Sequence, residues 1–144
     1  IGPQYWTNKK DSAYKFGDAH KVKISSSKKR IHIYNFDTFD KKHPDLNSLN
    51  LYIEYINFME EREVELQFLP EKDFDKEKYE KRGSLIIDNK SVIIAINPED
   101  GARFGEVSFK EKDLISYKSR FDDIDEMAIS SEEFKIILEK RYKK

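Results

Sequence analysis

The stretch RIHIYNFDTFDKKHPDLNSLNLYIEYINFMEEREVELQFL, residues 30–69, decides the fold. Its first part, residues 30–36, is rich in β-branched and aromatic residues over a length typical of a strand. Residues 45–61 then place apolar side chains along one broad helical face, and residues 64–69 predict a second strand. A strand, a helix and a strand within about 40 residues are typical of a right-handed parallel crossover, so both strands are expected in one sheet.

Further apolar runs follow this segment. SLII (residues 84–87) and SVIIAI (residues 91–96) are separated by the turn-forming residues Asp88 and Asn89, which predicts a β-hairpin. Ser130 or Ser131, with Glu133 nearby, resembles a helix-capping signal. The other predicted elements are a short strand at 106–109 and helices at 11–27, 112–127 and 132–142.

Length and composition favour a single domain over residues 1–144, and the order of the predicted elements makes it an α/β domain with a central mixed sheet of about five strands and helices packed on its faces. The chain has 144 residues, 38% of them charged, and enough aromatic residues, 13%, to exclude global disorder. No apolar run approaches the roughly 20 residues that span a bilayer, so we expect a cytoplasmic protein without membrane contact. Because the sequence begins with Ile1 instead of methionine, we expect a piece of a longer chain.

The charge distribution is uneven although the formal net charge is only −1. Residues 1–30 are rich in Lys and Arg, whereas residues 121–133 hold acids and no base. A basic leading segment is able to meet nucleic acid or to lie against the acidic surface of the protein itself. The second interpretation is favoured, because nucleic-acid domains are usually basic overall.

Known catalytic and cofactor motifs are missing from the sequence. Without cysteine there is no disulfide framework, thiolate metal site or cysteine nucleophile. The three histidines, His20, His32 and His43, do not pair at the spacing of four that places two metal ligands on one helix face. Neither phosphate-binding glycine motif occurs, and G-x-S-x-G is also missing. We therefore expect no metal and no cofactor.

The order of elements and the string RGSLIIDNKSVIIAIN (residues 82–97) resemble one half of a phospholipase D-like domain, over residues 10–127. In that superfamily, the first strand of the hairpin carries a catalytic His-x-Lys-x4-Asp motif. Aligning its aspartate with Asp88 places Lys81 where the nucleophilic histidine belongs and Gly83 where the lysine belongs. Phosphodiester transfer needs an imidazole to attack and cations to neutralise the phosphate, so the resemblance implies a catalytically silent half.

The resemblance also implies partners. Active members of the superfamily pair two halves across a twofold or pseudo-twofold axis, so a single half is expected to form a homodimer or to dock on another half-domain. Degenerate halves occur as effector-binding or dimerisation modules beside DNA-binding domains. We therefore expect a noncatalytic ligand-sensing or dimerisation domain of a larger, transcription-regulatory microbial protein, with DNA contacted mainly by a domain outside this segment.

The expected ligand is a small anion, bound in a cleft at the strand ends where the loops after Phe36, Leu69 and Ile87 meet. Lys81 and Arg82 are suited to bind it, although they also balance the nearby acids of the same segment. The residues expected to line the cleft are His32, Tyr34, Lys81, Arg82, Asp88 and Asn97.

Two alternatives belong to other classes. The first is a phosphodiesterase or nuclease half completed by another domain, with His20 or His43 acting together with Lys21 or Lys42. The second is a nucleic-acid-binding module that uses the basic N-terminal segment. Its stacking surfaces would be Tyr5, Trp6, Tyr14 and Phe16.

Overall fold

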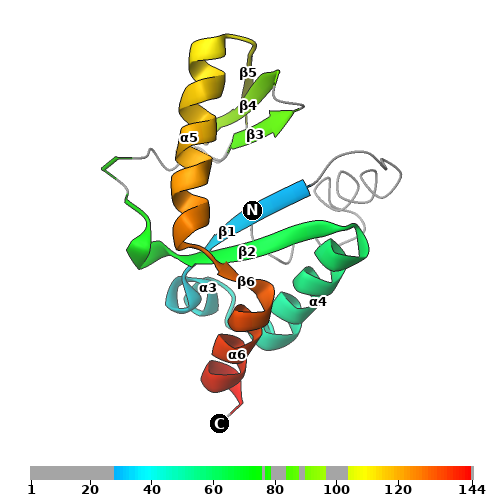
Figure 1. The fold of residues 1–144 in the computed structure, drawn as a ribbon. Coiled ribbons are helices and arrows are strands. Elements are labelled where there is room, and N and C mark those ends of the chain that lie inside the picture. The colour runs from blue at the N-terminus through cyan, green and yellow to red at the C-terminus, as the bar shows by residue number, and fades with distance from the viewer. Residues whose placement is uncertain (1–27, 76, 79–83, 88–89, 97–103, 144) are drawn as a thin grey trace. The chain divides into compact units, whose positions relative to one another are not determined.

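The computed structural model describes residues 28–75, 77–78, 84–87, 90–96 and 104–143 (Figure 1). It is a mixed α/β structure that divides into two compact units. Unit 1 consists of the chain up to Glu71 together with Ala128–Lys144, and unit 2 is Lys72–Met127, inserted between them in the sequence. The predicted helix at residues 11–27 lies outside the described residues.

The sheet of unit 1 contains the predicted crossover. Strands β1 (Lys28–Tyr34) and β2 (Val64–Pro70) are parallel, in a register that runs from Lys28 opposite Val64 to Tyr34 opposite Pro70. The short strand β6 (Ile129–Ser130) pairs antiparallel with β2, which gives the order β1-β2-β6. The parallel pairing expected from residues 30–69 is confirmed.

Two helices connect β1 to β2, where the sequence predicted one. Helix α3 (Phe36–Lys42) begins directly after β1 because the Asn35 side chain accepts a hydrogen bond from the Thr38 amide at 3.0 Å. The expectation that the strand continues through Phe36 is therefore wrong. Helix α4 (Ser48–Glu61) begins three residues later than predicted, because Asn47 caps it by accepting from the Asn50 amide at 3.1 Å.

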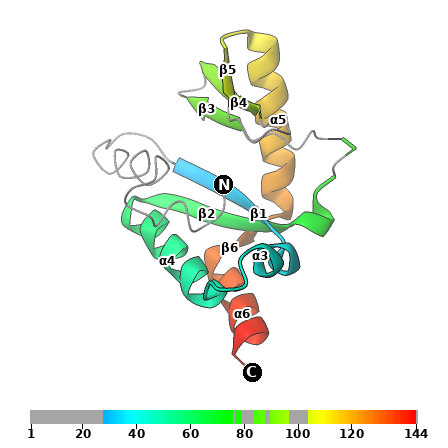
Figure 2. The same cartoon turned by 180° about the vertical axis from the view of Figure 1, so that it is seen from behind.

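The core of unit 1 is aromatic and lies between the sheet and three helices. Figures 1 and 2 show α3, α4 and α6 (Ser131–Tyr142) on the same side of the β1–β2 pair. Helix α6 has the predicted cap, since the Ser130 hydroxyl accepts from the Glu133 amide at 3.2 Å. Its Phe134 ring stacks on Phe68 of β2, with centroids 3.6 Å apart. The fully buried members of the core are Tyr52, Tyr55, Ile56, Phe68, Phe134 and Leu138.

Unit 2 contains the predicted hairpin and one further strand. Strands β3 (Ser84–Ile87), β4 (Ser91–Ile96) and β5 (Phe104–Ser108) form an antiparallel sheet in sequence order. Helix α5 (Glu111–Met127) packs against β3 and β4, as Figure 1 shows. A short 3-10 turn, η1 (Glu71–Asp73), follows β2 at the boundary of the two units.

The expectation of one central sheet of about five strands is wrong. The described strands form two three-stranded sheets, one mixed and one antiparallel. The physical reason is that β2 takes its second neighbour from β6, far along the chain, while β3, β4 and β5 satisfy one another through short connections. Within the ranges described, none of the helices has the length and apolar character needed to cross a bilayer.

Candidate functional site

Of the six residues predicted to line a cleft, the structure describes two, both in the core of unit 1. The His32 side chain is only 9% exposed, and its ring meets those of Tyr52, Tyr55 and Phe68 edge to face at 5.3–6.2 Å. Burial, and then the charge of Arg30, lower the pKa of His32 to about 3, so the ring is neutral at physiological pH. Tyr34 is also buried. Lys81, Arg82, Asp88 and Asn97 lie outside the described residues.

Two of the three loops expected to form the cleft meet in unit 1. The carboxyl ends of the parallel strands β1 and β2 lie at the same edge of their sheet, and the side-chain amide of Asn35 donates to the Glu71 carboxylate there at 3.0 Å. This hydrogen bond links the loop after β1 to the loop after β2. The third loop, after Ile87, lies outside the described residues.

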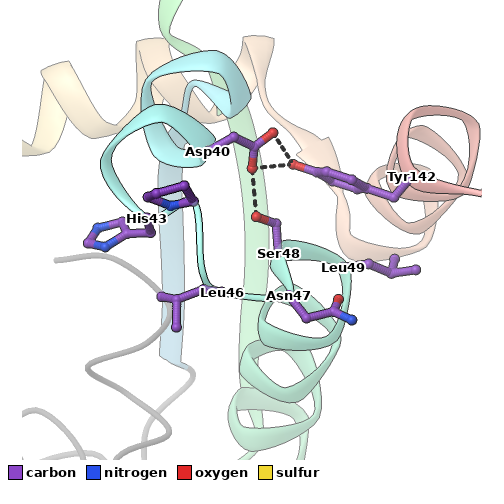
Figure 3. Close-up of a pocket in the computed structure, with 8 residues that line it drawn as sticks. Asp40, His43, Leu46, Asn47, Ser48, Leu49 and Tyr142 are labelled. Carbon is purple, nitrogen blue, oxygen red and sulfur yellow. Dashed lines mark hydrogen bonds between the residues drawn. The ribbon is translucent and has the colours of Figure 1, made fainter.

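A pocket of about 350 Å³ lies in unit 1 where α3, α4 and the C-terminal turn of α6 come together (Figure 3). It is about the size of a small-molecule site, although it is open to solvent on one side. Polar and apolar groups share its wall. The lining residues are Asp40, His43, Pro44, Leu46, Asn47, Ser48, Leu49 and Tyr142.

The carboxylate of Asp40 lies at the centre of this pocket wall. Ser48 donates to it at 2.6 Å, and the Tyr142 hydroxyl lies 3.0 Å from both of its oxygens. Figure 3 shows Asp40 between these two hydroxyl groups. Arg141 adds a charged hydrogen bond at 3.1 Å. We call Asp40, Ser48, Arg141 and Tyr142 the clasp, since they join three helices.

Burial and hydrogen bonds shift the pKa values of the ionisable groups in the clasp. Burial of Asp40 opposes its ionisation, but the hydrogen bonds from Ser48, Arg141 and Tyr142 outweigh burial and lower its pKa. The 2.8 Å bond to Asp37 is the largest cause that raises the pKa of Arg141, and its bonds to Asp40 and Tyr142 raise it further. Burial raises the pKa of Tyr142, so its hydroxyl stays protonated. The guanidinium of Arg141 also lies 5.1 Å from the Phe36 ring centroid, over its face.

These contacts suit binding and positioning better than nucleophilic chemistry. The Ser48 hydroxyl donates to a carboxylate, whereas an activated serine needs a base such as an imidazole. Figure 3 shows His43 pointing away from Asp40 and Ser48, and its ring lies 5.0 Å from that of Phe39. Within the part of the chain that the structure describes, no three metal-ligating side chains come together.

A second depression, of about 430 Å³, lies in unit 2 beside β5. Val107 and Phe109 there are 53% and 77% exposed. The Ser108 hydroxyl donates to Asp113 at 2.5 Å and accepts from the Lys110 amide at 3.3 Å, which fixes the turn from β5 into α5. Glu106 completes the lining together with these residues.

Sequence reasoning missed both features. Asp40 and Tyr142 are 102 residues apart, and no motif links them. A local signal did exist for α3, since Asn35 followed by Asp37 is an N-terminal pattern of helices. Comparisons of the chain with protein-family models, with curated proteins and with solved structures give no match.

Proposed function

We propose that this chain is a noncatalytic, phospholipase D-like α/β domain that works by association, as a dimerisation module of a larger regulatory protein. The parallel crossover and the hairpin follow each other in the order that the resemblance requires. The hairpin belongs to a sheet of its own, so the resemblance supports the proposal through element order alone.

The observation that carries the proposal is the placement of exposed apolar side chains in unit 2. Val107, Phe109 and Ile115 lie within nine residues of one another, and each is more than half exposed. Exposed large apolar groups with charged neighbours such as Glu106 and Lys110 are typical of surfaces that bind another protein. A module that dimerises needs such a surface. On a protein that stays monomeric, the same surface promotes aggregation.

Sedimentation velocity of the full 144-residue chain over a wide concentration range tests this proposal. We expect the weight-average mass to rise from that of the 17.2 kDa monomer toward twice that value. A mass that stays at the monomer value up to the solubility limit would overturn the proposal.

The noncatalytic part of the proposal rests on Lys81 and Gly83, which stand where the superfamily has its histidine and its lysine, and His32 offers no substitute for that histidine. A buried neutral imidazole surrounded by aromatic rings cannot reach a phosphodiester without opening the core. We expect no turnover of bis(4-nitrophenyl) phosphate by the chain. Turnover that disappears in a His43→Gln variant would instead support the phosphodiesterase alternative, in which His43 acts.

The clasp pocket favours a second candidate function, the sensing of a small ligand. Among the residues that line the pocket there is one carboxylate, from Asp40, and no lysine or arginine. A small cation therefore fits this pocket better than the anion expected from Lys81 and Arg82. Titration with methylguanidinium should shift the NMR signals of Ser48 and Tyr142, and inorganic phosphate should not; the reverse pattern would contradict this candidate.

A further inference from the structure

Strand β5 is an edge strand of the antiparallel sheet. Among the described residues, β5 pairs with β4 alone, which leaves its other side as a row of backbone donors and acceptors. Natural edge strands are usually protected by charge, bulges or covering segments. Here Val107 in β5 and Phe109 directly after it are exposed, and both residue types favour strand pairing.

We propose that two copies of this chain pair through β5, antiparallel, with Ser108 on the twofold axis. The inference rests on the proposed dimerisation function and names its contact. In an isologous interface the same patch must complement itself. The segment Glu106–Lys110 has the sequence EVSFK. When a second copy runs antiparallel beside it, the residues that come to lie opposite each other are complementary.

The self-complementarity is visible residue by residue. With Ser108 opposite its own copy, Val107 lies opposite Phe109 of the other copy, and the symmetry repeats this pair. Aromatic and β-branched residues are among the favourable cross-strand pairs. Glu106 lies opposite Lys110, again twice, so each charged side chain faces its opposite. Both charged side chains are exposed and able to meet in this way.

The length of the pairing is limited by the structure. The Lys110 carbonyl accepts a hydrogen bond from the Leu114 amide and so belongs to the first turn of α5. The Lys110 amide already donates to the Ser108 hydroxyl, so the backbone pair is limited to Glu106–Phe109, of which Phe109 lies just beyond β5, and Glu106 meets Lys110 through side chains alone. Stable interfaces usually bury about 1,600 Å² in total, more than a short strand pair provides. We therefore expect a dimer that dissociates on dilution.

A charge-swap cycle tests the register. Glu106→Lys places two lysines opposite each other at both pairs, and Lys110→Glu does the same with two glutamates. Each single variant should raise the dimer dissociation constant by about tenfold, and the double variant Glu106→Lys/Lys110→Glu should restore it. Loss of dimer in the singles without recovery in the double would overturn this register.

A cysteine substitution tests the axis. Because the chain has no cysteine, Ser108→Cys introduces a unique thiol. Directly opposite residues in an antiparallel pair have Cα atoms about 4.5–5.5 Å apart, within the range of a disulfide. We expect Ser108→Cys to form a covalent dimer under mild oxidation. The matched control Ile136→Cys is also exposed but lies on α6 of unit 1, and it should stay monomeric on a denaturing gel.

Val107→Lys separates the possible failures. It should abolish the dimer seen in sedimentation velocity, whereas Ile136→Lys should leave it unchanged; circular dichroism checks that both variants fold. If the wild-type chain is monomeric, the proposed function itself fails. If it is dimeric but indifferent to Val107→Lys, and Ser108→Cys does not cross-link, only the β5 contact fails.

Discussion

The two units of this protein differ in where their described aromatic residues lie. Unit 1 collects ten buried hydrophobic residues, six of them aromatic, into one cluster between the sheet and three helices. Unit 2 buries Phe74, Val92 and Ile124 but leaves Val107 and Phe109 exposed beside an edge strand. Phenylalanine is thus part of a core in unit 1, whereas unit 2 leaves one phenylalanine, Phe109, exposed.

This difference shows that composition does not assign a role to an aromatic residue. Phe134 and Phe109 are the same side chain, yet one is fully buried and the other is 77% exposed. Burial of a Phe side chain contributes about 1.5–3 kcal/mol, whereas an exposed one contributes little until a partner covers it. The stability of unit 1 and the proposed association through unit 2 therefore follow from the same hydrophobic effect.

Removing each of the two phenylalanine rings in a separate variant is the strongest test of this comparison. Phe134→Ala should lower the free energy of unfolding by about 3–5 kcal/mol, because it removes the ring stacked on Phe68 and leaves a cavity. Phe109→Ala should change it by less than about 0.5 kcal/mol. Chemical denaturation followed by circular dichroism gives both values. Similar losses for the two variants would contradict the assignment of core and surface.

Acid should destabilise the core of unit 1 through His32. The pKa of His32 is lowered to about 3 in the folded state, so below pH 6.5 the unfolded state binds a proton that the folded state does not. The free energy of unfolding should then fall by up to about 1.4 kcal/mol per pH unit as the pH drops from 6.5 toward 4.5. His32→Phe should lose this part of the pH dependence, whereas His43→Gln should keep it. An unchanged slope in His32→Phe would show that another group is responsible.

Removing the charge at the centre of the clasp should have a smaller effect. Asp40→Asn should cost about 2 kcal/mol, since Ser48, Arg141 and Tyr142 all direct donors at this carboxylate. Asp37→Asn should cost less than about 1 kcal/mol, because the Asp37 side chain is 90% exposed.

The pH profile of the same variant checks the origin of this cost. Because the pKa of Asp40 is lowered in the folded state, its contribution is complete above the unfolded value near pH 4 and is lost as the pH falls further. The difference between wild type and Asp40→Asn, measured by urea denaturation, should shrink below pH 4. A difference that stays constant down to pH 2 would contradict a role for the charge.

The smallest expected effect concerns the cap of α6. Ser130→Ala should cost about 1 kcal/mol, because the Glu133 amide loses its hydrogen-bond acceptor. Ser116→Ala, on an exposed position inside α5, should be neutral or slightly stabilising, since alanine has the higher helix propensity. Thermal unfolding monitored at 222 nm distinguishes the two. Equal effects would mean that the Ser130 contact carries no stability.

Much of the local structure was predictable from the sequence. The strands at 64–69 and 84–87 and the helix at 132–142 follow from patterns that repeat every two or three to four residues. Their ends depend on single side chains, and the position of Asn47 as the cap of α4 explains why that helix begins later than expected. Local propensity and capping act over a few residues, so a sequence displays them directly.

The candidate site was much less predictable. Prediction placed His32 and Tyr34 at a cleft because alternate residues of a strand share a face, and they do share one. What that face meets was decided by α4 and α6, which cover it with Tyr52, Tyr55 and Phe134. The clasp was hidden because its members come from three helices.

The sequence by itself determined which segments become helices and strands, the parallel order of the first two strands and the lack of any cysteine chemistry. The tertiary structure alone decided that the strands form two sheets, that His32 is neutral and buried, and that Asp40 meets Tyr142. Periodicity and capping are properties of neighbouring residues, whereas burial, pKa and pairing depend on which distant segment covers a face.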